Sequence, residues 1–211
     1  MELIEQLDLF FKSEACSLPG YKSQNQMSPP HRYDLLKYVS GYVDAAVAIL
    51  LYKKNDDYYF PVIKRTSGNY NHSGQISLPG GKKDDSDVDL AECALRELEE
   101  ELGIGSNTAR ISGQLSELLI PVSNFRVQPY VFITDQTPDF KPQLSEVEYI
   151  IEVNMNDLMD DSNIKNGKIT LQSGFILDNI PYFYINSHII WGATAMILSE
   201  FKNVCINLKT K

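Results

Sequence analysis

LPGGKKDDSDVDLAECALRELEEELGI, residues 78–104, is the most informative segment of the chain. Its apolar residues recur at helical spacing, which predicts a helix over 87–102. Ser86 followed by Asp89 fits an N-terminal capping box, and Gly103 fits the position just beyond a helix end. The apolar stripe that we expect to face the core comprises Leu90, Ala91, Ala94, Leu95, Leu98 and Leu102.

Three carboxylates share another face of this predicted helix. Glu97, Glu100 and Glu101 have the spacing i, i+3 and i+4, and Arg96 lies beside them. The last turn of a helix carries a partial negative charge, so carboxylates there are unfavourable without a positive partner. Hard cations such as Mg²⁺ and Mn²⁺ prefer carboxylate oxygen and would offset this charge. The face is therefore either a divalent-metal site or a solvated acidic surface.

A pair of glycines precedes the helix. Leu78-Pro-Gly-Gly81 predicts a tight turn, in which backbone N–H groups can approach a phosphate closely. A plain turn would use the same residues. The turn, the capped helix and the acidic face occur together, and this combination favours a phosphate site assisted by metal.

The rest of the chain predicts alternating strands and helices around this helix. We expect an amphipathic helix over 2–14, an irregular segment over 16–41 and a long loop over 66–86. No segment is rich enough in Gly, Ser or Pro to separate two domains, so the pattern favours an α/β sandwich. The expected strands are 43–53, 58–65, 110–120, 125–134 and 147–153, with short ones near 168–171, 175–178 and 182–186, and a final helix over 188–203.

Composition excludes several classes of protein. The 211 residues carry a net charge of −9, which argues against a nucleic-acid binder because phosphate neutralisation needs clustered Lys and Arg. The longest apolar run, Ala45–Tyr52, has eight residues, whereas a membrane span needs about 20. Three separated cysteines indicate neither a disulfide framework nor a zinc site. We expect a soluble, cytoplasmic protein without a nucleic-acid or membrane partner.

The segment resembles the Nudix box, whose pattern is G-x5-E-x7-R-E-U-x-E-E-x-G-U, with U a bulky aliphatic residue. Residues 96–104, RELEEELGI, match every fixed position of the second half. The first half differs, because Gly81 lies one residue further from Arg96 than the pattern has it. Val88 also replaces the expected Glu, and either Asp87 or Asp89 is a candidate substitute. Helix capping is the alternative role for both aspartates.

The longer spacing resembles the coenzyme A pyrophosphatase branch of Nudix hydrolases. That branch has an upstream pattern, L-L-T-x-R-[SA]-x3-R-x3-G-x3-F-P-G-G, and Arg65, Gly74 and Pro79 through Gly81 keep its register. Tyr70 replaces the second Arg of the pattern, which removes a cation from the expected substrate site. Glu146-Val147 and the segment 190–195, IWGATA, also resemble this branch.

The resemblance implies a Nudix-type α/β/α sandwich with a mixed β-sheet, over residues 42–204, preceded by an N-terminal helix and irregular lead-in over 1–41. It also implies metal-dependent hydrolysis of a nucleoside diphosphate linked to another group. The leading substrate is coenzyme A or acyl-coenzyme A, cleaved to 3′,5′-ADP and 4′-phosphopantetheine. The alternatives are ADP-ribose or a dinucleotide as substrate, and a non-catalytic nucleotide-binding module on the same fold.

The site residues follow from the same resemblance. Glu97, Glu100, Glu101 and the Gly81 carbonyl would hold Mg²⁺ or Mn²⁺, and Arg96 would orient a glutamate. The candidates for the catalytic base are Glu97, Glu100 and Glu146. The oligomeric state stays open, with a homodimer as one alternative. The residues expected to contact substrate are Arg65, Tyr70, His72 and Gly80.

Overall fold

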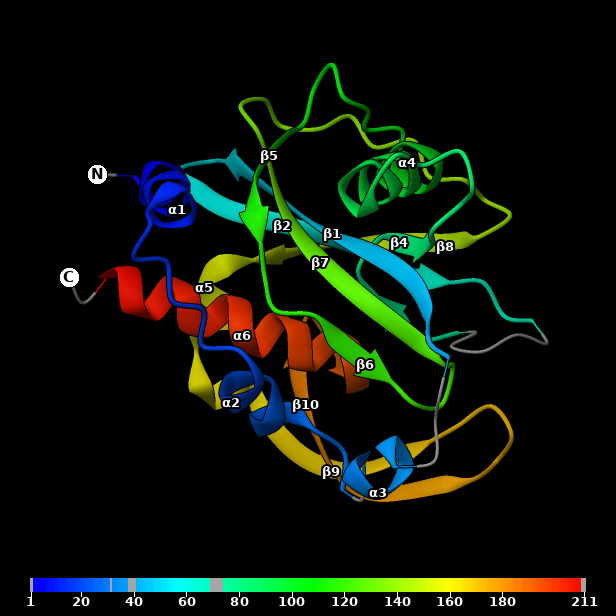
Figure 1. Ribbon diagram of the computed structural model, residues 1–211. Coiled ribbons are helices and arrows are strands. Elements are labelled where there is room, and N and C mark those ends of the chain that lie inside the picture. Colours follow the sequence, from blue (N-terminus) through cyan, green and yellow to red (C-terminus); the bar gives the residue numbers. More distant parts are fainter. Residues whose placement is uncertain (1, 31, 38–40, 69–73, 210–211) are drawn as a thin grey trace.

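The computed structural model describes residues 2–30, 32–37, 41–68 and 74–209, and a mixed sheet forms its centre (Figure 1). The strand order is β3-β2-β1-β7-β5, with β4 paired to β1, β6 to β7 and β8 to β2. β1 and β7 run parallel, and the other pairs are antiparallel. The strands are β1 (Val43–Lys54), β2 (Asp57–Arg65), β3 (Ile76–Ser77), β4 (Gly80–Lys82), β5 (Arg110–Gln114), β6 (Leu118–Ile120), β7 (Phe125–Thr134) and β8 (Val147–Asn154).

The first two strands form the expected hairpin. Asn55 and Asp56 at its tip have φ values of 51° and 67°, a conformation that short polar side chains tolerate better than most residues do. β1 is buried along most of its length because helices cover both faces of the sheet. This two-sided burial explains the uninterrupted apolar run in the sequence.

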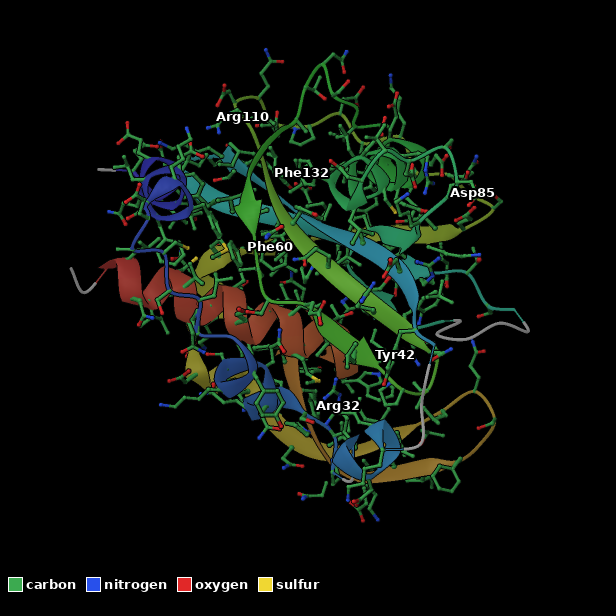
Figure 2. The ribbon with its side chains drawn as sticks, in the orientation of Figure 1. Arg32, Tyr42, Phe60, Asp85, Arg110 and Phe132 are labelled. Atoms are coloured by element: carbon green, nitrogen blue, oxygen red, sulfur yellow. The ribbon has the colours of Figure 1, made fainter. Side chains whose placement is uncertain are left out.

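Two helices form the outer layers. α4 (Leu90–Leu102) covers one face of the sheet and α6 (Gly192–Lys209) covers the other (Figure 1). Figure 2 labels one buried side chain of each layer, Phe132 on the α4 side and Phe60 on the α6 side. The prediction of an α/β/α sandwich with a mixed sheet is confirmed.

A second sheet, absent from the sequence prediction as a unit, has the order β11-β10-β9. The predicted helix over 188–203 was wrong at its start. His188–Trp191 form β11 and pair with β10, and α6 begins only at Gly192, where φ is 64°. The two short strands expected at 175–178 and 182–186 are one strand. This sheet comprises β9 (Ile164–Thr170), β10 (Ile176–Ile185) and β11 (His188–Trp191).

Other boundaries also differ from the expectation. The single strand expected over 110–120 is divided into β5 and β6, and the expected loop over 66–86 contains β3 and β4. Strands this short give no periodicity that sequence reasoning can detect. The remaining helices are α1 (Leu3–Lys12), α2 (Tyr21–Gln24), a 3₁₀ turn (Asn25–Met27), α3 (Arg32–Leu36), α5 (Met155–Met159) and a second 3₁₀ turn (Asp161–Asn163).

The N-terminal segment packs onto the rest of the chain. α1, expected over 2–14, contacts β5 and α6, and α2 also contacts α6. Leu7 and Met27 are fully buried in the same apolar cluster as α6. The division into a lead-in over 1–41 and a domain over 42–204 stays a prediction. No helix in the described part of the chain is long and apolar enough to cross a membrane.

Candidate active site

The start of α4 is fixed by Asp89. Its carboxylate accepts hydrogen bonds from the N–H groups of Ala91 and Glu92, both at 2.9 Å, so the helix begins at Leu90. The prediction that Ser86 caps a helix beginning at 87 was therefore wrong, and Ser86 instead donates to Asp84 at 3.1 Å. Gly103 ends the helix with a φ of 74°, as expected.

The two glycines before the helix lie in a strand rather than in the expected turn. Gly80 and Gly81 belong to β4 and pair with Val47 and Ala46 of β1. A Cβ at Gly80 would lie 2.3 Å from the carbonyl oxygen of Ala46, and one at Gly81 would lie 2.3 Å from Oε1 of Glu97. Glycine at both positions lets β4 lie directly against the carboxylates of α4.

Glu101 is the most buried of the three helix carboxylates, with a side chain only 1% exposed. Its Oε1 lies 3.1 Å from the Arg65 guanidinium, and its Oε2 accepts from the N–H of Gly80 at 2.8 Å. Burial nevertheless raises the pKa of Glu101 to about 7, and the nearby charges of Glu97 and Glu146 add to this effect. One guanidinium and one N–H do not fully compensate this carboxylate. The Gly80 N–H thus donates its hydrogen bond to Glu101 within the protein.

Arg96 lies at the centre of the second part of the site. Its Nη1 is 3.0 Å from Oε1 of Glu97 and 2.9 Å from Oε2 of Glu100. Its Nε and Nη2 bind both oxygens of Asp87, at 2.9 and 3.0 Å. Burial raises the pKa of Glu97 despite the contact with Arg96. Arg96 thus contacts three carboxylates at once, and its orienting role stays a prediction.

The structure separates the two aspartates that the sequence left as alternatives. Asp89 is the helix cap, whereas Asp87 is buried and forms a bidentate pair with Arg96. That pair lowers the pKa of Asp87 to about 2. Sequence reasoning did not identify Asp87 as the residue that positions Arg96. The sequence did offer one signal for Asp87: the Glu that the Nudix pattern expects is replaced by Val88, and Asp87 is the acidic residue directly before it.

Glu146 reaches the same region from a distant part of the chain. Pairing of β2 with β8 places Arg65 opposite Val147, and the Glu146 carbonyl accepts from the N–H of Thr66 at 2.9 Å. The Glu146 side chain is exposed, and its charge raises the pKa of both Glu97 and Glu101. The fold therefore gathers the α4 carboxylates and Glu146 at one end of β2 and β4.

The donor chemistry of this cluster suits Mg²⁺ or Mn²⁺, because every ligand candidate supplies oxygen. In the described residues, no three His, Cys, Asp or Glu side chains come close enough together to hold an ion, and Arg96 pairs with both Glu97 and Glu100. Burial raises the pKa of both Glu97 and Glu101, and a bound cation would offset the cost of burying their negative charge. The residues fit the metal expected from the sequence by their chemistry.

A cavity of about 270 Å³ adjoins the carboxylates, and we name it the phosphate-side cavity. Arg65, Gly80 and Gly81 line it, so three residues of the sequence prediction meet at one opening. Ser77, also on its wall, has a buried Oγ without a hydrogen-bond partner among the described residues. The other predicted contacts, Tyr70 and His72, lie outside the described residues.

Cys93, on the core side of α4, has no role as a nucleophile. Its thiol is buried, its Sγ lies 3.8 Å from the Gly81 carbonyl, and burial raises its pKa to about 12. A thiol that stays protonated at neutral pH is a poor nucleophile.

Comparison with known families agrees with this geometry. The NUDIX domain model matches residues 42–171, which include β1, β4, α4 and Glu146. The chain belongs to the Nudix family. In this Nudix chain, the metal-ligand candidates Glu97, Glu100 and Glu101 lie in the second half of the Nudix box, and the matched region ends before β10 and α6.

Individual relatives refine the assignment within the family. The chain is 32% identical to the uncharacterized Nudix hydrolase NudL of Yersinia enterocolitica, over 60% of this chain and 64% of that protein. It is 31% identical to the mitochondrial coenzyme A diphosphatase NUDT8 of Mus musculus, over 60% of each chain. The chain therefore aligns with less than two thirds of the length of these curated relatives.

A solved structure supports the fold. A Nudix hydrolase from Mycobacterium smegmatis, RenU, superposes with a TM-score of 0.51 at 11% identity, covering 80% of this chain and 90% of that one. At this identity the likeness concerns the fold alone. The chain thus has the mixed α/β architecture of its family.

Proposed function

We propose that this chain is a divalent-metal-dependent pyrophosphohydrolase that cleaves coenzyme A or acyl-coenzyme A into 3′,5′-ADP and 4′-phosphopantetheine. The observation that carries the proposal is the group of buried or clustered carboxylates against Gly81, next to the phosphate-side cavity. The likeness to a mammalian coenzyme A diphosphatase supports the choice of substrate. We also propose that the protein acts in the cytoplasm and keep a homodimer as an alternative to a monomer.

Each residue has a defined task in this proposal. Glu97, Glu100, Glu101 and the Gly81 carbonyl would hold Mg²⁺ or Mn²⁺. When bound, the ion supplies neutralising charge for the diphosphate and lowers the pKa of water. Arg96 holds Glu97 and Glu100 in position, and Asp87 holds Arg96 in turn.

The substrate would enter through the phosphate-side cavity. Arg65 presents a guanidinium on its wall, and Lys82 follows Gly81 on the same wall, so both cations favour a polyanionic diphosphate. Gly80 leaves space for close approach because it has no side chain. Tyr70 and His72 belong to the substrate contacts only as sequence predictions.

Glu146 is our choice for the base that takes a proton from the attacking water. It is exposed, whereas Glu97 and Glu100 are both engaged by Arg96. Within the described residues no ion pair holds Glu146 in another role. A base needs a free carboxylate oxygen within reach of water, which Glu146 provides.

A hydrolysis assay with Mg²⁺ or Mn²⁺ tests the proposal. The substrates are coenzyme A, acyl-coenzyme A, ADP-ribose, NADH and diadenosine polyphosphates, with products identified by mass. We expect metal-dependent release of 4′-phosphopantetheine that is lost in Glu100→Gln and kept in Glu99→Gln, an exposed neighbour on the same helix. Cleavage of ADP-ribose or a dinucleotide instead would favour the other substrate class, with the Tyr70 replacement as its cause. No turnover of any substrate would favour a non-catalytic nucleotide-binding module.

A further inference from the structure

A second cavity, which we name the tail cavity, has a volume of about 360 Å³. Apolar side chains dominate its wall, among them Pro30, Leu35, Leu118, Leu177 and Met196. Apolar cavities of several hundred Å³ are the usual size for small-molecule sites. The tail cavity therefore has both the size and the lining to bind an aliphatic group.

The tail cavity is built largely by parts of the chain outside the matched family region. Pro30 and Leu35 come from the N-terminal segment, Leu177 from β10 and Met196 from α6, whereas the NUDIX domain model covers residues 42–171. The function of the family domain alone thus does not explain this cavity.

The two cavities share a wall. Gln75, Ile120, Trp191 and Ala193 line both the tail cavity and the phosphate-side cavity. A molecule whose diphosphate lies beside Gly80 and Gly81 would therefore find the tail cavity next along its length. The shared residues place the two cavities side by side, so one extended ligand would reach both.

Arg32 contributes a positively charged side chain to the wall of the tail cavity. Its side chain is buried, and it donates to the carbonyl oxygen of Leu119. No carboxylate pairs with it in the described residues, and burial lowers its pKa. The guanidinium has five N–H donors, so an oxygen acceptor from a ligand would be well accommodated. An acyl group supplies this combination of a carbonyl oxygen and an aliphatic chain.

We propose that the tail cavity binds the acyl end of the diphosphate substrate and that the chain selects acylated over free substrate. This inference rests on the proposed function for the identity of the diphosphate. Trp191 has the largest side chain among the four residues that line both cavities, so we assign it as a specificity-determining residue at their junction.

Binding can be measured without turnover. Trp191 is the single tryptophan of the chain, so its fluorescence reports on ligands in either cavity. We would titrate the metal-free protein with coenzyme A and with its acetyl, octanoyl and dodecanoyl thioesters. We expect affinity to rise by about fourfold for each buried methylene until the cavity is full, as apolar burial predicts. Equal affinity for all four ligands would overturn the proposal.

A matched pair of variants locates the effect. Leu177→Arg places a charge on the wall of the tail cavity, whereas Ile176→Arg adds the same charge on the adjacent, exposed residue that lines none of the cavities described above. We expect Leu177→Arg to remove most of the gain from the acyl chain and Ile176→Arg to keep it. Val122→Arg, at a residue that is 67% exposed, provides a second test if Leu177→Arg does not fold.

The outcomes separate this inference from the proposed function. If coenzyme A is cleaved but chain length and Leu177→Arg change neither binding nor kcat/KM, the tail-cavity proposal is wrong and the proposed function stands. If no diphosphate is cleaved but dodecanoyl-coenzyme A still binds through Leu177, the tail cavity stands and the hydrolase proposal fails.

Discussion

Two buried glutamates on opposite sides of the sheet have different surroundings. Glu101 on α4 contacts one guanidinium and one backbone N–H, and other carboxylates lie nearby. Glu200 on α6, which is fully buried, accepts from the N–H groups of Gly20 and Ser116 at 3.1 and 3.2 Å and from Nε2 of Gln24 at 2.9 Å. Glu200 joins three segments of chain by hydrogen bonds from neutral donors alone.

The difference shows that burial of a carboxylate does not by itself indicate a functional site. Around Glu200 the donors match the acceptor oxygens, so nothing further is needed there. Around Glu101, burial raises the pKa to about 7 even though the Arg65 guanidinium lies 3.1 Å away, so its negative charge is only partly compensated. The arrangement at Glu101 favours an added cation, and that at Glu200 favours a permanent structural contact.

The largest expected effect is a difference in enzymatic activity between variants of Glu101 and of Glu200. Glu101→Gln should lower diphosphate turnover by about 10³-fold, because a metal ligand contributes several kcal/mol to the transition state. Glu200→Gln should leave turnover of the folded protein within about threefold, since a distant substitution does not remove a transition-state contact. Steady-state assays of both variants at the same temperature measure this. An equal loss in Glu200→Gln at unchanged folding would contradict the comparison.

The second prediction concerns the stability of the Glu200 variant rather than its activity. Glu200→Gln turns one acceptor oxygen into a donor that faces N–H groups, so we expect a loss of about 2 kcal/mol in the free energy of unfolding. Urea unfolding followed by circular dichroism gives the value. Glu99→Gln, at an exposed position of α4, is the control and should stay within about 0.5 kcal/mol. A Glu200→Gln value as small as the control would mean that the three hydrogen bonds are dispensable.

The third prediction concerns how the α4 carboxylates are held. Arg96→Lys keeps the charge but loses the planar group that contacts Asp87, Glu97 and Glu100 at once, so kcat/KM should fall by about 10- to 100-fold. Arg110→Lys is the matched control because Arg110 binds Asp8 with two nitrogens away from the site. Retained activity in Arg96→Lys would show that charge alone is sufficient.

The smallest effect is a dependence of stability on pH. The pair with Arg96 lowers the pKa of Asp87 to about 2, below its unfolded value of about 3.9. The folded state then releases this proton more readily, so Asp87 stabilises the protein above about pH 4 and loses this contribution as pH falls toward 2. Between pH 5 and pH 2.5, we expect the free energy of unfolding to fall less in Asp87→Asn than in the unsubstituted protein. An equal fall in both proteins would show that Asp87 does not contribute to the pH dependence.

Much of this architecture could be predicted from the sequence because its signals are local. The period of apolar residues predicted α4, two apolar runs around a polar turn predicted the β1–β2 hairpin, and Gly103 predicted the helix end. The catalytic candidates on α4 are neighbours along one helix, so their proximity followed from helical spacing alone. Arg65 was expected near them only through the family resemblance, whereas Gly80 and Gly81 were also expected there as a turn before the helix, and the structure brings all three together.

Features that depend on distant contacts could not be predicted. β3 and β4 are too short to show a period, so Gly80 and Gly81 were read as a turn although β1 holds them in a strand. The apolar segment before Gly192 was assigned to a helix, but pairing with β10 makes it a strand. Glu200 is a single acid in an apolar helix, and only the folded chain reveals its donors.

The Glu200 contact also has a consequence for the order in which the protein can assemble. Gly20 and Gln24 precede Glu200 by 180 and 176 residues, so both donors are synthesised well before their acceptor. α1 and α2 likewise find part of their packing surface on α6. The packing of α1 and α2 can therefore be completed only after α6 has been synthesised, and until then part of their packing surface has no partner.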